Sequence, residues 1–180
     1  MQYIIKVRIL REQLSNKTSG IQKQSGIYCW WFKKDVALKL LANLPLNADE
    51  KAKIQKRDID GEEYWALYFG ISKDMLGRAN WHVMQSHTES AVKNGTLSTL
   101  RNTIGALLNK DMSKSQNIVN NTIDTCYWEW EYNSDPKEVE NNELTSTTKC
   151  YPLNIQENQT VSKEVLKALK KMRRLHKDKN

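Results

Sequence analysis

The sequence has few of the residues that mark extracellular or metal-stapled chains. Its 180 residues include only seven glycines, three prolines and three cysteines, and none of the cysteines forms a Cys-x-x-Cys pair. An odd number of widely spaced cysteines argues against a disulfide framework or a zinc site, and favours a reducing cytoplasm. We therefore expect buried or idle thiols at Cys29, Cys126 and Cys150.

Long hydrophobic runs are also missing. No apolar stretch approaches the roughly 20 residues that a membrane-spanning helix needs. The first ten residues, MQYIIKVRIL, mix Lys6 and Arg8 into their apolar side chains, unlike a signal peptide. With 39% hydrophobic residues, the chain has enough apolar surface to fold as one domain. We expect a cytoplasmic protein without membrane contact.

Positive charge is concentrated at one end of the chain. The net charge is +7, and residues 161–180 hold eight Lys or Arg against two acidic residues, which gives this segment +6. Four apolar residues in it share one helical face: Val161, Val165, Leu169 and Met172. The pattern predicts a basic C-terminal helix or tail over 161–180. Such a helix either packs its apolar stripe on the body or also contacts phosphates.

Hydrophobic periodicity predicts a small α/β or α+β domain over residues 1–160. Alternating or aromatic-rich segments predict strands at 1–10, 26–32, 64–71 and 124–133. Helical spacing predicts helices at about 34–44, from about 73 to Gly95, at 96–110 and after Asp135-Pro136. This order indicates three or more strands with helices packed against them.

Two tyrosine motifs lie on neighbouring predicted strands. The first strand holds GIY at Gly26–Tyr28, and the second holds YFG at Tyr68–Gly70. Antiparallel pairing could bring both tyrosines to one side of the sheet. The following helix offers Arg78 and His82, which share a face at i and i+4. Phosphodiester cleavage needs a base, a cation for the charged transition state and usually a metal, and these residue types fit those tasks.

These motifs resemble the GIY-YIG nuclease family over about residues 25–156, and the resemblance implies a small, mostly antiparallel central sheet flanked by helices. In that family an Arg follows the second Tyr by ten residues and a His or Tyr often lies four further on, as Arg78 and His82 do after Tyr68. A Glu on a later helix and an Asn beyond it complete the family pattern. The segment VENNELTSTTKCYPLN supplies Glu140 and, 14 residues later, Asn154.

The resemblance implies a role for each matched residue of the first two motifs and the helix. Tyr28 would be the general base or would orient the attacking water, with Tyr68 as its hydrogen-bonded partner. Arg78 would stabilise the pentavalent phosphate. His82 would assist Tyr28 or hold a phosphate. Taken singly, each residue has a simpler interpretation: core tyrosines, a solvated arginine and a packed histidine.

The resemblance also implies one divalent metal ion and three supporting residues. Glu140 would ligate a single Mg²⁺ or Mn²⁺. Glu143, one helical turn away and 11 residues before Asn154, is the alternative ligand. Asn154 would brace the site, and Gly26 and Gly70 belong to the two motifs. We expect Gly70 to let the backbone turn tightly.

As a whole, the resemblance implies a metal-dependent DNA endonuclease that leaves 5′-phosphate and 3′-hydroxyl ends, without a small-molecule cofactor. Tyr28 and Tyr68 are 40 residues apart, further than in compact members, so residues 33–63 would be an insertion. Sequence-specific cutting would favour a homodimer. Candidate DNA contacts are Lys73, Arg101, Lys170, Lys171, Arg173 and Arg174.

Two other functions remain open at this point. The first is a non-catalytic DNA-binding or protein-interaction module that retains the fold. The second is a structural domain whose basic tail binds a partner protein or RNA. Residues 33–63 and 157–180 carry no base-reading motif, so the sequence does not identify the DNA.

Overall fold

A five-stranded antiparallel sheet forms the centre of the computed structural model, which describes residues 1–108 and 112–178. The strand order is β1-β5-β2-β4-β3, and every neighbouring pair is antiparallel. The strands are β1 (Tyr3–Lys6), β2 (Gly26–Lys33), β3 (Lys56–Ile59), β4 (Glu62–Ser72) and β5 (Tyr127–Tyr132).

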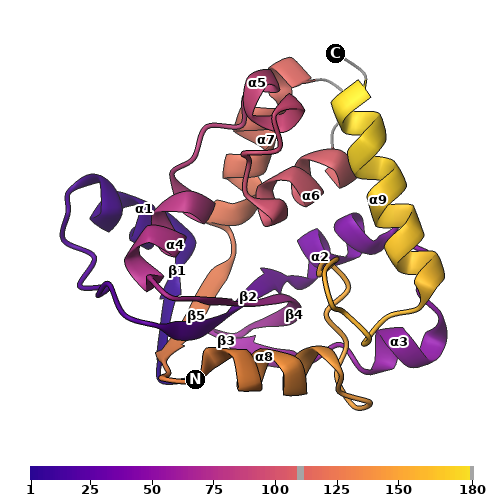
Figure 1. Ribbon diagram of the computed structural model, residues 1–180, viewed down its shortest axis with the longest axis horizontal. Helices are drawn as coiled ribbons and strands as arrows, with labels where there is room; N and C mark the ends of the chain where they lie inside the picture. Colours follow the sequence, from indigo (N-terminus) through magenta and orange to yellow (C-terminus); the bar gives the residue numbers. More distant parts are fainter. Residues whose placement is uncertain (109–111, 179–180) are drawn as a thin grey trace.

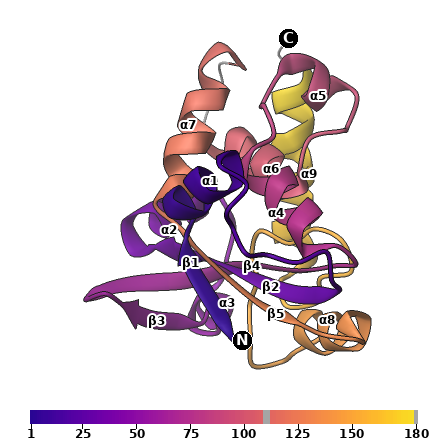
Figure 2. The same ribbon diagram turned by 90° about the vertical axis from the view of Figure 1, so that its left-hand side faces the viewer.

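Most of the helices lie on one side of the sheet, and α8 lies on the other (Figures 1 and 2). The helices are α1 (Val7–Ser15), α2 (Lys34–Leu41), α3 (Ala48–Ala52), α4 (Met75–Val83), α5 (Glu89–Lys93), α6 (Thr99–Leu108), α7 (Met112–Asp124), α8 (Pro136–Leu144) and α9 (Lys163–Asp178). None of the helices described is long and apolar enough to cross a membrane.

Strand β2 is buried on both faces because it is the central strand. Its alternating side chains divide between two apolar clusters. Tyr28, Trp30 and Phe32 join the large cluster under the helical layer, whereas Cys29 and Trp31 join a smaller cluster under α8. This alternation is the two-residue period of a strand, and it gives the sheet two chemically different faces.

A bulge interrupts the pairing of β2 with β4 beside Tyr68. Trp30 pairs with Tyr68, but the next residue, Trp31, pairs with Ala66, so Leu67 is the extra residue of β4. Tyr68 and Leu67 consequently both belong to the cluster under the helical layer. A bulge of this kind lets two successive residues of one strand contribute to the same face.

The expected fold class is confirmed: the domain is α+β with an antiparallel sheet flanked by helices. One strand is shorter than predicted. The strand expected over 1–10 ends at Lys6, because Val7, Leu10 and Leu14 instead form the buried face of α1. The three cysteines are buried and free, as expected.

Two segments that the sequence set apart are integrated into the fold. Residues 33–63 contain α2, α3 and β3, and β3 extends the sheet by pairing with β4. The C-terminal segment forms α9, whose Val165 and Leu169 are buried in the large cluster and whose Met172 packs against it. The apolar stripe of α9 therefore packs on the body, which leaves its cations on the remaining faces.

Candidate active site

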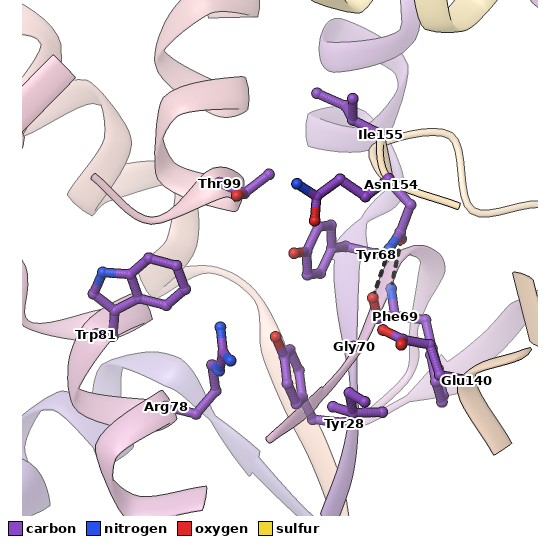
Figure 3. A pocket seen from close by; sticks show the side chains of 12 residues that line it. Tyr28, Tyr68, Phe69, Gly70, Arg78, Trp81, Thr99, Glu140, Asn154 and Ile155 are labelled. Atoms are coloured by element: carbon purple, nitrogen blue, oxygen red, sulfur yellow. Dashed lines mark hydrogen bonds between the residues drawn. The ribbon is translucent and has the colours of Figure 1, made fainter. Parts of the chain in front are cut away.

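A cavity of about 220 Å³ opens where β2, β4, α4, α8 and the segment after α8 meet. Figure 3 shows Tyr28, Tyr68, Arg78 and Glu140 around one shared space. Trp81, Thr99, Asn154 and Ile155 complete much of its wall. Segments as distant in the sequence as 28 and 154 therefore contribute to one site.

Tyr28 lies across Gly70 on the neighbouring strand, and this contact explains the glycine. The two residues are paired in the antiparallel register. A Cβ atom placed on Gly70 would lie 2.5 Å from Cζ of Tyr28, which is far inside van der Waals contact. The expectation that Gly70 permits a tight turn is therefore wrong. Gly70 lies within β4 and makes room for the Tyr28 ring.

Gly26 is also required for close packing. A Cβ atom at this position would collide with the backbone carbonyl oxygen of Glu131 on β5 and would approach the side chain of Met75 on α4. Both glycines of the two motifs thus allow the sheet and α4 to approach each other.

His82 lies behind Tyr28 and is fully buried. Its Nε2 forms a hydrogen bond with Tyr28 Oη at 2.9 Å, and its Nδ1 forms one with Ser98 Oγ at 2.6 Å. Burial, with the positive charges of Arg78 and Arg101, holds the pKa of His82 well below its usual value. The imidazole is therefore neutral at pH 7, and one of its nitrogens remains an acceptor.

The two tyrosine hydroxyls are held in their protonated form. Burial, followed by the neighbouring Tyr68 hydroxyl, raises the pKa of Tyr28 well above its usual value. Burial also raises the pKa of Tyr68, against the opposing charge of Arg78. Their ring centroids are 6.4 Å apart. Neither hydroxyl is ionised at neutral pH.

Arg78 supplies positive charge to the cavity from α4. The helix begins after Asp74, whose carboxylate accepts a hydrogen bond from Gly77 N at 2.9 Å, and Arg78 follows in the first turn. Its guanidinium lies 4.8 Å from the centroid of the Trp81 ring. Within residues 1–108 and 112–178, no ion pair involves Arg78. The charge is thus not neutralised by a carboxylate.

Glu140 and Glu143 lie on the same helix but face different cavities. Glu140 lines the cavity of Tyr28 and Arg78, and its carboxylate pairs with Lys137 at 3.0 Å. Glu143 instead accepts hydrogen bonds from Tyr151 Oη at 2.5 Å and Lys149 Nζ at 2.6 Å, beside a second cavity. The structure therefore places Glu140, and not Glu143, with the tyrosines.

Asn154 completes the exposed edge of β4. Its Oδ1 accepts a hydrogen bond from Phe69 N at 2.9 Å, and its Nδ2 donates one to Phe69 O at 2.7 Å (Figure 3). The adjacent Leu153 N also donates to Leu67 O at 3.0 Å. Asn154 thus acts as a short strand would, and it fixes the backbone between Tyr68 and Gly70.

The predicted DNA contacts are not all on the surface. Lys73, Lys170, Lys171 and Arg174 are exposed, and Arg173 is half-buried. Arg101 is fully buried, which corrects the expectation that it contacts DNA. Its guanidinium donates to the backbone oxygen of His82 at 3.1 Å and to Asn120 Oδ1 at 2.7 Å. Arg101 therefore joins α6 to α4 and α7 and does not reach a ligand.

Two residues of the site were not found from the sequence. Ser98 holds the far nitrogen of His82, and Trp81 stacks with Arg78. Ser98 precedes the apolar helix α6, which is a position where serine usually caps a helix. That signal predicts a helix start but not a contact with a histidine 16 residues earlier in the chain.

The carboxylate that lines the cavity suits a metal ion that is also bound by a ligand. The described residues contain no group of three or more His, Cys, Asp or Glu that could hold a metal by itself. Glu140 is the one carboxylate among the described residues that line the cavity. Mg²⁺ commonly binds through one or two carboxylates together with substrate phosphates and waters, so this donor set fits a phosphate-bridged ion.

Comparisons with known proteins agree with this arrangement. A sequence model of a family described as GIY-YIG catalytic domain matches residues 26–175. The match begins at the first residue of β2 and extends through most of α9, so β1 and α1 lie outside it. No curated protein and no solved structure gives a significant match.

Proposed function

The chain belongs to the GIY-YIG catalytic domain family, and we propose that it is a metal-dependent DNA endonuclease which hydrolyses phosphodiester bonds. One observation carries the proposal. Tyr28, Tyr68, Arg78 and Glu140 come from four separate elements and line a single cavity. A phosphate in this cavity would then lie within reach of a general base, a cation and a carboxylate that can hold a metal ion.

Tyr28 activates the attacking water through His82. The tyrosine is protonated, so it can accept a proton from water only if its own proton leaves at the same time. The neutral imidazole receives it at Nε2, 2.9 Å away, in the tautomer whose Nδ1–H donates to Ser98 Oγ. The water oxygen bonds to phosphorus, the bond to the 3′ oxygen breaks, and that oxygen takes a proton from solvent water to become the 3′-hydroxyl. The products carry 5′-phosphate and 3′-hydroxyl ends.

Arg78 stabilises the charge that develops on the phosphate. The non-bridging oxygens gain negative charge in the transition state, and a fixed guanidinium beside them lowers that energy. Stacking on Trp81 holds this group in place without neutralising it. Tyr68 lines the same cavity, and its hydroxyl donates a hydrogen bond to the phosphate or to the attacking water.

Glu140 is the residue that would hold one Mg²⁺ or Mn²⁺ together with the substrate phosphate. When bound, the ion supplies positive charge to the phosphate oxygens. Glu140 lines the cavity, its side chain is 17% exposed, and its described partner is the exposed Lys137. Lys137 also pairs with Glu157, so it keeps an ion pair when Glu140 binds a metal.

The wider substrate-binding surface follows from the remaining cations. We assign sequence-independent DNA contact to Lys73 near the start of α4 and to the exposed cations of α9. In this proposal, residues 1–160 form the nuclease domain with 33–63 as an insertion, and residues 161–180 form a basic helix that adds DNA contacts. Two copies of the chain would be needed to cut both strands of a symmetric site.

A plasmid-cleavage assay tests the proposal directly. Purified protein with Mg²⁺ should nick or linearise supercoiled DNA, and EDTA should stop it. Tyr28→Phe and Glu140→Ala should each lower the rate by about 10²-fold or more. Tyr151→Phe and Glu143→Ala are matched controls, since they remove the same groups from the other face of the sheet. The site assignment fails if cleavage survives both changes at the tyrosine cavity. DNA binding without metal-dependent cutting would indicate a non-catalytic module.

A further inference from the structure

A second cavity, of about 310 Å³, lies between α9 and the region of α5 and α6. Its wall contains four cations of α9 and three residues of the facing segments: Lys170, Arg173, Arg174, Lys177, Val92, Gly95 and Asn102. No acidic residue is among those that line it within the described chain. We call it the basic cavity.

The four cations occupy one side of α9. Residues 170, 173, 174 and 177 have the i, i+3, i+4, i+7 spacing that brings side chains to one helical face. Lys167 and Lys171 belong to the same helix and are exposed, but they do not line the cavity. The helix therefore carries two groups of cations, and only one group lines the basic cavity.

Two buried polar atoms of the basic cavity lack partners. Asn102 is only 7% exposed, and its Oδ1 accepts no hydrogen bond from the described residues. The Nε atom of Arg173 is likewise buried without a described acceptor. Unpaired buried polar atoms are costly. A phosphate oxygen would satisfy the Arg173 Nε–H, whereas Asn102 Oδ1 is an acceptor and would need a donor such as a water molecule bound with the phosphate.

The wall of the basic cavity is held in place by contacts outside it. Val165 and Leu169 bury the opposite side of α9 in the core. His176 Nε2 and His87 Nε2 are 3.1 Å apart in a buried contact that joins the end of α9 to the segment before α5. The four cations therefore lie on a helix that packs against the core. This packing holds them close together despite their mutual repulsion.

The basic cavity is close to the tyrosine cavity. Thr99 in the first turn of α6 lines the tyrosine cavity, and Asn102, three residues later on the same helix, lines the basic cavity. Arg173 lines the basic cavity, whereas Tyr68 lines the tyrosine cavity. A polyanion that occupies one cavity would therefore pass beside the other.

We propose that the basic cavity binds one or two backbone phosphates of the DNA strand whose scissile phosphate lies in the tyrosine cavity. The proposal rests on the nuclease function proposed above. Phosphate oxygens accept hydrogen bonds from arginine and lysine, and each backbone phosphate offsets one of the four like charges. The cavity would fix the position of the strand along the site and would carry no base specificity.

Two double variants with equal charge loss test the proposal. Lys170→Ala with Lys177→Ala removes two cations of the basic cavity, and Lys39→Ala with Lys51→Ala removes two exposed cations of α2 and α3, outside that cavity and outside the proposed DNA contacts. Both are made in the Glu140→Ala background. Anisotropy of a labelled DNA duplex in EDTA gives Kd over a range of NaCl concentrations.

The cavity pair should raise Kd by about tenfold and should flatten the slope of log Kd against log [NaCl] by about two units. The control pair should raise Kd by no more than about threefold, with little change of slope, because it alters only the diffuse field. Equal losses in the two pairs, or no loss in either, would overturn the proposal. Circular dichroism melting confirms that both double variants and their Glu140→Ala parent are folded.

Two further arms separate the ligand and the function. Calorimetric titration with inorganic phosphate tests whether a free anion is the ligand: tight binding that the cavity pair abolishes, without a difference in DNA affinity, would refute the DNA assignment. A wild-type protein that never cuts DNA but loses affinity in the cavity pair would refute the nuclease function and keep the cavity. A wild-type protein that cuts DNA, together with a cavity pair whose DNA affinity is unchanged, would keep the nuclease function and refute the role of the basic cavity.

Discussion

The sheet carries a cavity on each face, and the two cavities contain the same kinds of residues. The tyrosine cavity has Tyr28, Tyr68, Arg78 and Glu140. The opposite cavity, of about 340 Å³, is lined by groups of the same types, among them Tyr151, Arg57, Glu129 and Glu143. Residue type alone therefore does not distinguish a candidate active site from a structural cluster.

The difference lies in how the polar groups are paired. In the opposite cavity Glu129 accepts from Trp31 Nε1 at 2.7 Å and from Arg57 at 3.1 Å, and Glu143 accepts from Tyr151 and Lys149. Each of these two carboxylates is paired with residues that line the same cavity. In the tyrosine cavity Arg78 has no carboxylate partner within the described chain, so its charge remains available to a ligand.

Replacement of the arginine on each face should give the largest contrast. Arg78→Ala should lower the rate of DNA cleavage by about 10²–10³-fold, because the transition state loses its fixed cation. Arg57→Ala should leave the rate per folded molecule unchanged, although it removes a charged partner of the buried Glu129, which keeps its neutral partner Trp31 on the cavity wall, and lowers the free energy of unfolding by about 1–3 kcal/mol. Single-turnover cleavage and urea unfolding measure the two effects. Equal rate losses would contradict the comparison.

A methyl group at Gly70 should disturb only the tyrosine cavity. Gly70→Ala places Cβ against Tyr28 and must displace its ring, which should slow cleavage by about 10²-fold and destabilise the fold by about 1–3 kcal/mol. The steric cause can be isolated with a double-mutant cycle. In a Tyr28→Ala background the same change should cost almost no stability, and a full additional cost there would show that Gly70 acts through something else.

The histidine behind Tyr28 predicts a pH dependence. His82 must be neutral to accept a proton, and its pKa lies well below the usual 6.5 or so. The cleavage rate should therefore not fall as pH drops through about 6.5, and it should fall only at lower pH where His82 becomes protonated. A rate–pH profile at saturating DNA measures this, and a half-maximal point near the ordinary histidine pKa would contradict the relay.

Ser98 should have a smaller effect through His82. Ser98→Ala removes the hydrogen bond to Nδ1, so the ring loses its orientation and its tautomer is no longer fixed. We expect kcat to fall about tenfold with KM for DNA unchanged. Ser98→Thr keeps the hydroxyl and should restore most of the rate. A purely structural role would instead move stability without changing the rate of folded enzyme.

The sequence predicts four of the five strands and the tyrosine pair from local patterns, but it does not predict β3, whose residues are mostly charged. Aromatic and β-branched runs define β2, β4 and β5, and the i, i+4 spacing correctly places Arg78 and His82 on one helix. The same spacing does not separate their environments: Arg78 lines the cavity, whereas His82 is buried behind Tyr28.

Relative position within an element could be predicted, but absolute orientation could not. Glu140 and Glu143 are one turn apart in any helix, and only the packing of α8 on the sheet decides which faces Tyr28. The burial of Arg101 has no signal in the sequence, since its acceptors are a backbone oxygen of α4 and an amide of α7. Such contacts between distant segments require the structure.

The smallest expected effects belong to the carboxylate of the opposite cavity. Glu143→Gln keeps the shape of the side chain but weakens its hydrogen bond with Tyr151 Oη and its ion pair with Lys149. The free energy of unfolding should fall by about 1–2 kcal/mol, with cleavage unchanged. Glu140→Gln, the matched change one turn earlier, should do the opposite: it should abolish cleavage and leave stability within about 1 kcal/mol, since its only described partner is the exposed Lys137. Urea unfolding and cleavage rates of the pair decide the matter. If Glu143→Gln were the variant that lost cleavage, the metal-binding carboxylate would lie on the other face of α8.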